Sequence, residues 1–127
     1  MPEERFDIFH LEDDSEKIPF WERAAKEAGL SYSNTPCLNG LIGALEKKTE
    51  AGIWILDWRF PEEKGGQILE LGNQAYELIL ARHPEAKIAF HSKSEAAIDA
   101  ARKYGAPYLG ELLPDEALTE IRRMLGK

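Results

Sequence analysis

Apolar positions along the chain form short runs, separated by longer stretches in which apolar residues recur at helical spacing. The short runs are rich in β-branched and aromatic residues and indicate strands, with IWIL (53–56) the clearest and LSYSN (30–34) the weakest. The longer stretches each carry one apolar face, as amphipathic helices do. The predicted strands are 6–11, 30–34, 53–56, 87–91 and 106–112, and the predicted helices are 18–29, 38–45, 67–82, 96–105 and 118–125.

Glycines mark the weak points of this assignment. Glycines inside the predicted helix 38–45 lower its helix propensity. In the long helix 67–82, Gly72 and Asn73 are the place where an interruption is easiest, and PEEKGG (61–66) predicts a loop before it.

Strand and helix alternate five times along the chain. Such alternation predicts an α/β protein in which parallel strands are joined by crossover helices that cover both faces of the sheet. A central strand of that kind is buried on both sides, which explains the unbroken apolar run at 53–56. We therefore expect one doubly wound domain with a five-stranded parallel sheet, spanning residues 1–127.

Composition narrows the function classes. The apolar fraction of 43% and charged fraction of 31% are typical of a soluble globular protein. No run is apolar enough to span a bilayer, the acidic start MPEERFD does not resemble a signal peptide, and the single cysteine, Cys37, excludes an internal disulfide. We expect a cytoplasmic protein with no membrane partner. A net charge of −7 argues against direct nucleic-acid binding.

Polar side chains follow most of the predicted strands. In an open parallel sheet, sites form beyond the carboxyl ends of the strands. The residues at those positions are Glu12, Asp13 and Asp14 after the first strand, Asp57 after the third, Ser92 after the fourth and Glu111 at the end of the fifth.

Several carboxylates at one rim repel each other unless a cation lies among them. Oxygen ligands of this kind suit Mg²⁺. A carboxylate such as Asp57 is also a competent nucleophile toward phosphorus. The rim therefore indicates Mg²⁺-assisted phosphoryl chemistry.

Four segments carry a resemblance to a known family. LEDDS, LDWRFP followed by Gly65, AFHSK and GAPYL resemble, in the same order, the motifs of response-regulator receiver domains from two-component signalling. The resemblance covers essentially the whole chain. It implies a (βα)5 flavodoxin-like fold and a signalling domain rather than an enzyme.

The resemblance also implies roles for the acidic rim. Asp57 would accept the phosphoryl group, and Glu12 and Asp13 would hold Mg²⁺ together with Asp57 and the backbone carbonyl of Arg59. Ser92 would hydrogen-bond the phosphoryl group.

Further implications of the resemblance concern the switch and the partners. Tyr108 would change rotamer when the domain is phosphorylated. The phosphodonor would be a histidine kinase or a phosphotransfer protein. The output would pass to a downstream protein partner or through a homodimer.

One departure from the family is serious. Receivers usually carry Lys-Pro at the end of the fifth strand, where this chain has Glu111 and Leu112. A carboxylate there adds negative charge beside a phosphoryl dianion. This departure favours an alternative in which the domain is a pseudo-receiver that binds a protein partner without phosphorylation.

Simpler explanations compete at several positions. Asp57 could cap a turn, and Asp13 with Glu16 has the spacing of a helix capping box. Ser92 begins an S-x-x-E capping pattern, and Tyr108 could be a core residue.

Two other kinds of site have weaker support. His10 and His91 near carboxylates suggest zinc, but their spacing matches no zinc motif. A phosphate-ester hydrolase using Asp57 would need a D-x-D sequence, and position 59 is Arg.

Overall fold

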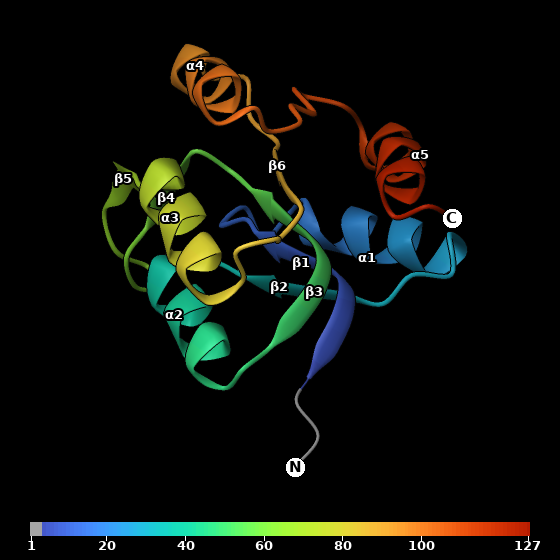
Figure 1. Ribbon diagram of the computed structural model, residues 1–127, viewed down its shortest axis with the longest axis horizontal. Helices are drawn as coiled ribbons and strands as arrows, with labels where there is room; N and C mark the ends of the chain where they lie inside the picture. The colour runs from blue at the N-terminus through green and yellow to red at the C-terminus, as the bar shows by residue number, and fades with distance from the viewer. Residues whose placement is uncertain (1–3) are drawn as a thin grey trace.

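Parallel strands joined by helices form the core of the structure, a computed structural model that describes residues 4–127. The strands of the main sheet lie in the order β2-β1-β3-β6, and all of their pairings are parallel (Figure 1). The strands are β1 (Arg5–Leu11), β2 (Tyr32–Thr35), β3 (Glu50–Leu56), β4 (Arg59–Pro61), β5 (Ile68–Glu70) and β6 (Ile88–Phe90). The helices are α1 (Ile18–Glu27), α2 (Leu38–Glu46), α3 (Gly72–Arg82), α4 (Glu95–Tyr104) and α5 (Pro114–Met124).

Helices cover both faces of this sheet, as the alternation predicts. In Figure 1, α2 and α3 lie to the left of the sheet and α1 and α5 to the right. Successive residues of the strands point to opposite faces, so Ile53 and Ile55 pack in the cluster with α1 and α5, whereas Trp54 and Leu56 pack with α2, α3 and α4. Both faces are apolar, which confirms the doubly wound α/β fold.

The predicted fifth strand, 106–112, is reduced to one parallel bridge between Phe90 and Tyr108. The Phe90 N–H donates to the Pro107 carbonyl (3.1 Å), and the Leu109 N–H donates to the Phe90 carbonyl (2.7 Å). Longer pairing is prevented locally, because Pro107 has no N–H to donate and Gly110 turns the chain at a φ of +62°. The segment still occupies the fifth position of the sheet.

A short antiparallel hairpin, β4 and β5, replaces the predicted loop and the first turn of the predicted helix 67–82. The carbonyl of Trp58 accepts hydrogen bonds from the N–H groups of Leu71 and Gly72 (both 3.1 Å). A Cβ at Gly72 would lie 2.4 Å from the Trp58 ring, so only glycine permits this contact. Gly72 therefore begins α3 rather than interrupting it.

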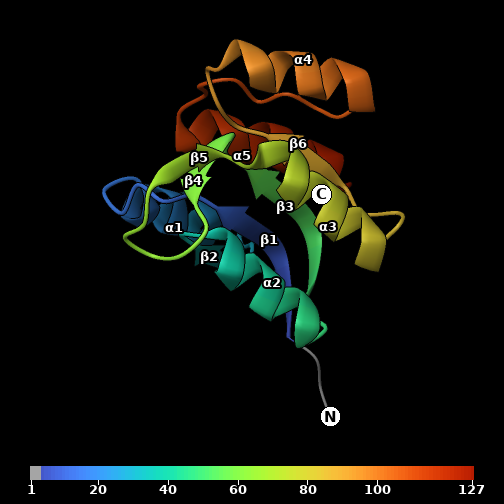
Figure 2. The same cartoon turned by 90° about the vertical axis from the view of Figure 1, so that its left-hand side faces the viewer.

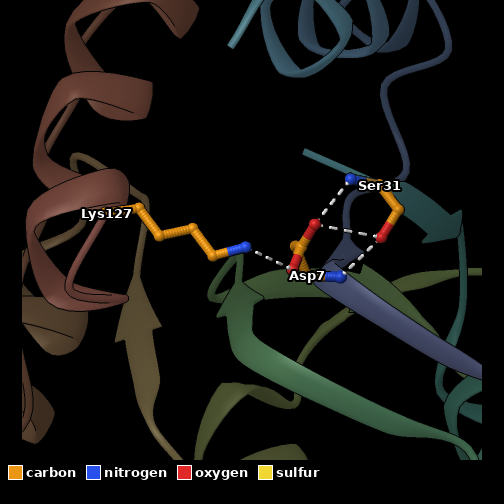
Figure 3. Close-up of polar contacts among 3 residues, drawn as sticks. All are labelled: Asp7, Ser31 and Lys127. Carbon is orange, nitrogen blue, oxygen red and sulfur yellow. Dashed lines mark hydrogen bonds and ion pairs between the residues drawn. The ribbon is translucent and has the colours of Figure 1, made fainter. Parts of the chain in front are cut away.

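Polar contacts fasten the amino end of β1. Asp7 accepts hydrogen bonds from the N–H (2.9 Å) and hydroxyl (3.2 Å) of Ser31 and forms an ion pair with Lys127 (3.4 Å) near the end of the chain (Figure 3). Ser31 also accepts the Asp7 N–H (2.8 Å). These contacts lie at the opposite end of the strand from Glu12.

In the described part of the chain, every helix is too short or too polar to cross a membrane.

In Figure 2, α4 lies at the top of the molecule, beyond β6. Its small residues Ala97, Ala100 and Ala101 face the core, and Tyr104 stacks on Tyr76 of α3 with ring centroids 4.1 Å apart.

Candidate functional site

The carboxylates that follow β1 and β3 meet at one point. Glu12, Asp13 and Asp57 each place an oxygen within 4.8 Å of the others. The two strands are neighbours in the sheet, and the chain order reverses between them. The acidic cluster of Glu12, Asp13 and Asp57 therefore lies at the switch point of the fold, where ligands of open α/β sheets bind.

This acidic cluster is electrostatically unfavourable without a cation. Glu12 is 2% exposed, and its carboxylate accepts the Asp14 N–H (3.2 Å). Burial, reinforced by the charge of Asp57, raises the pKa of Glu12 to about 8. Burial also raises the pKa of Asp57, against the opposing hydrogen bond that the Trp58 N–H donates to Asp57 Oδ1 (2.7 Å).

The donor set suits Mg²⁺. Carboxylate oxygens are its preferred protein ligands, and oxygens on opposite sides of an octahedral Mg²⁺ lie about 4.2 Å apart. One oxygen from each of the three carboxylates lies within 4.8 Å of the other two, close to that span, and water would complete the coordination. Arg59 lies two residues beyond Asp57 and lines the adjoining cavity, and the role of its carbonyl stays a prediction.

The acidic residues between β1 and α1 make different contacts. No capping box forms between Asp13 and Glu16, because the helix starts only at Ile18 and no side chain caps it. Asp14 instead accepts the Glu16 N–H (3.0 Å) and closes the turn. Asp13 is left facing Asp57.

Ser92, which follows β6, is hydrogen-bonded to Tyr108. Ser94, not Ser92, is the N-cap of α4, since its hydroxyl accepts the Ala96 N–H (3.2 Å). Ser92 Oγ accepts the Ser94 N–H (3.1 Å), which leaves the Ser92 hydroxyl hydrogen able to donate. The Tyr108 hydroxyl donates to the Ser92 carbonyl, and Tyr108 is 37% exposed rather than a core residue.

A cavity of about 840 Å³ opens beside the acidic cluster. Glu12, Asp57, His91 and Ser92 line it on the side of the strand ends, and Glu111, in the segment after Leu109, lines it as well. The charge of Glu111 contributes, after burial, to raising the pKa of Tyr108. The other lining side chains are Lys17, Phe20, Trp21, Arg59, Lys93, Ser94, Leu112, Leu113 and Pro114.

His10 is fully buried, and its ring meets that of His91 edge-on with centroids 6.4 Å apart. Its Nδ1 pairs with the Tyr32 hydroxyl (2.7 Å), and its ring packs against Trp21 with centroids 4.5 Å apart. Burial lowers the pKa of His10 to about 3, so the imidazole is neutral. His91 donates from Nε2 to the Leu112 carbonyl (2.9 Å). Both rings belong to the packing that holds α1 and the 110–114 segment in place.

Two features of this site are not predicted from the sequence motifs. Lys17 lines the cavity although no motif includes it, and Trp21, which the helical pattern places on the buried face of its helix, lines the cavity as well. The signal for Lys17 was its position at the end of the acidic run, immediately before a helix.

No family model matches the sequence, and no curated protein does either. Solved structures do match. The BeF3-activated receiver domain of nitrogen regulatory protein C (NtrC) is 25% identical, with a TM-score of 0.75 over 97% of this chain and 96% of that one.

Two further structures agree. The apo form of the NtrC receiver domain is 26% identical, with a TM-score of 0.73 over 95% of this chain and 94% of that one. A CheY-like receiver domain protein from Methanospirillum hungatei is 16% identical, with a TM-score of 0.75 over 98% and 95% of the two chains. The chain therefore has the receiver fold and, over nearly its whole length, resembles the receiver domains of response regulators in two-component signalling.

Proposed function

We propose that this domain accepts a phosphoryl group on Asp57 and uses the new charge to switch a protein-binding surface. The observation that carries the proposal is the acidic cluster, in which Asp57 lies beside Glu12 and Asp13 at the edge of an open cavity. The chain places these carboxylates together at a cost in electrostatic energy. Such conflicts are characteristic of functional sites.

The reaction needs a free carboxylate oxygen and an open approach. The Trp58 N–H holds Asp57 Oδ1 (2.7 Å), which fixes the carboxylate and leaves its other oxygen to attack. That oxygen bonds to phosphorus while the P–N bond of a phosphohistidine breaks. The nitrogen keeps the electron pair of that bond, and the product is an acyl phosphate. Bound Mg²⁺, held by Glu12, Asp13, Asp57 and the Arg59 carbonyl, would supply charge neutralisation for the phosphoryl oxygens.

Ser92 and Tyr108 give the site a route to the surface. The Ser92 hydroxyl would donate to a phosphoryl oxygen. Because Tyr108 holds the Ser92 carbonyl, a shift of Ser92 toward Asp57 would release the exposed Tyr108 ring. This would alter the face formed by α4, the 107–109 segment and α5. A protein partner or a second copy of the domain would read that change, and the phosphodonor would be a histidine kinase or a phosphotransfer protein.

A second candidate is a pseudo-receiver that binds its partner constitutively. It is favoured by Glu111 at the position where the resemblance implies lysine, and by the reduction of the fifth strand to one bridge. Under this alternative, the acidic cluster binds a cation without phosphorylation.

Intact mass spectrometry separates the two candidates. The domain is incubated with Mg²⁺ and acetyl phosphate, in parallel with Asp57→Asn and with Asp99→Asn, which alters an exposed carboxylate on α4. We expect one added phosphoryl group on the native chain and on Asp99→Asn, and none on Asp57→Asn. The absence of an adduct on all three chains would contradict the phospho-acceptor proposal and favour the constitutive module.

A further inference from the structure

The phosphorylated site would carry a large excess of negative charge. A phosphoryl dianion on Asp57 would lie beside Glu12 and Asp13, and Glu111 stands on the wall of the same cavity. One divalent cation does not balance these groups. If Asp57 accepts phosphate as proposed, the compensating charge must come from the cations that line the cavity: Lys17, Arg59 and Lys93.

Lys17 is anchored close to the acidic cluster. Its N–H donates to the Asp14 carbonyl (3.0 Å), and its carbonyl accepts from the N–H groups of Phe20 (3.2 Å) and Trp21 (3.3 Å). Trp21 is 1% exposed, so the backbone at Lys17 is fixed to the core by the first turn of α1. The exposed side chain of Lys17 is free to reach over the cavity.

The charge of Lys17 acts on both buried carboxyl groups. Burial raises the pKa of Glu12 and of Asp57, and the Lys17 ammonium draws both pKa values back down. The backbone hydrogen bonds from Asp14 to Glu12 and from Trp58 to Asp57 lower these pKa values more than Lys17 does. Lys17 thus influences Glu12 and Asp57, from a different element than the fifth strand.

Helix energetics give an independent reason to connect Lys17 with the acidic cluster. It occupies the N-cap of α1, where Ser, Thr, Asp or Asn is preferred and where a positive charge opposes the helix dipole. The first turn of α1 has no acidic residue to compensate. A lysine at this position is poor for the helix alone. It becomes favourable when an anion lies in front of the helix terminus.

We propose that Lys17 makes the cationic contact to the phosphoryl group on Asp57 that Glu111 cannot make. The ammonium would approach from the start of α1, across the cavity from the segment that carries Glu111. The site would retain phosphoryl transfer although its fifth strand lacks lysine.

Phosphorylation rates test the proposal. The rate with acetyl phosphate and saturating Mg²⁺ is measured for the native chain, Lys17→Gln, Lys17→Arg, Lys93→Gln and Lys26→Gln, the last altering an exposed lysine at the far end of α1. We expect Lys17→Gln to slow the reaction by about tenfold or more. Lys17→Arg should keep most of the rate because it keeps the charge, and Lys26→Gln should match the native chain. Adding Glu111→Lys to Lys17→Gln should restore the rate.

Mg²⁺ affinity, followed by Trp58 fluorescence without phosphodonor, provides a second readout. Removing Lys17 leaves the acidic cluster more negative, so Lys17→Gln should bind Mg²⁺ several-fold more tightly while accepting phosphate more slowly. A general loss of structure would weaken both. The opposite signs of the two effects therefore identify a charge contact.

Other outcomes would overturn the proposal. A native rate in Lys17→Gln, or a loss confined to Lys93→Gln, would exclude Lys17 as the contact and leave the proposed function standing. Equal losses in Lys17→Gln and Lys17→Arg would assign the effect to helix geometry rather than charge. A native chain that accepts no phosphate would overturn the proposed function and this inference with it.

Discussion

The two ends of β1 each carry a carboxylate, and the protein treats them in opposite ways. At the amino end, Asp7 receives hydrogen bonds from the N–H and hydroxyl of Ser31 and an ion pair from Lys127, and these contacts lower its pKa (Figure 3). At the carboxyl end, Glu12 is buried and faces two other carboxylates, and its pKa is raised to about 8.

This difference separates a structural carboxylate from a functional one. The chain supplies every partner that Asp7 needs, so its charge supports folding. At Glu12 the chain supplies one backbone N–H and the charge of Lys17 against two like charges, and the pKa stays raised, so the remaining requirement is for something outside the chain. Proteins tolerate such conflicts where binding or chemistry relieves them.

The largest expected effect is the pH dependence of stability at the carboxyl end. The folded pKa of Glu12, about 8, lies above its ordinary value of 4.5, so between these pH values the folded chain holds a proton that the unfolded chain has lost. The stability that protonated Glu12 contributes is complete below pH 4.5 and is lost as the pH rises through 8. Without Mg²⁺, the free energy of unfolding should fall by roughly 2–4 kcal/mol over this range. Urea unfolding at several pH values measures it.

Saturating Mg²⁺ is the matched control for that measurement. It binds the deprotonated carboxylates of the folded chain, and at a hundredfold excess over its Kd it should add about 2.7 kcal/mol at pH 8. Calcium-free and magnesium-free buffer should restore the original slope. A free energy of unfolding that is flat from pH 4.5 to 8 without metal would show that Glu12 and Asp57 are not in conflict.

The sequence predicted the fold well because the signals were redundant. Each central strand is apolar on both faces, each helix has one apolar stripe, and the two alternate along the chain, which together imply a doubly wound sheet. The prediction was wrong where one local contact decides the outcome. The hairpin of β4 and β5 depends on the Trp58 carbonyl and the close approach of Gly72 to the Trp58 ring. Which of the two candidate serines caps α4 likewise depends on one hydroxyl, that of Ser94.

The candidate site was predictable in part for a related reason. Strand ends of a parallel sheet share an edge, so the convergence of Asp57 with the acidic run follows from topology. Lys17 precedes a helix and belongs to no strand end, and its place on the cavity wall depends on where α1 begins. Side chains that approach a site from a helix terminus need the packed structure to be located.

The next largest effect is a stability gain from removing one charge of the acidic cluster. Asp57→Asn keeps an oxygen for the Trp58 N–H and replaces a repelling carboxylate with an amide that can donate to Glu12. Without Mg²⁺ at pH 8, we expect the free energy of unfolding to rise by about 1–2 kcal/mol. Thermal melts measure the gain, and saturating Mg²⁺ should abolish or reverse it. A destabilised Asp57→Asn chain would mean that Asp57 is a turn cap.

The smallest effect comes from the same substitution at the other end of β1. Asp7→Asn keeps an acceptor for Ser31 but loses the ion pair with Lys127, whose side chain is 50% exposed, so the free energy of unfolding should fall by at most about 1 kcal/mol. The lowered pKa of Asp7 means that its contribution is present above pH 3.8 and lost as the pH falls through the folded value. The loss on Asp7→Asn should therefore vanish in acid and shrink in high salt. Since Asp→Asn is expected to destabilise at position 7 and stabilise at position 57, equal signs at the two positions would contradict the distinction between the two ends of β1.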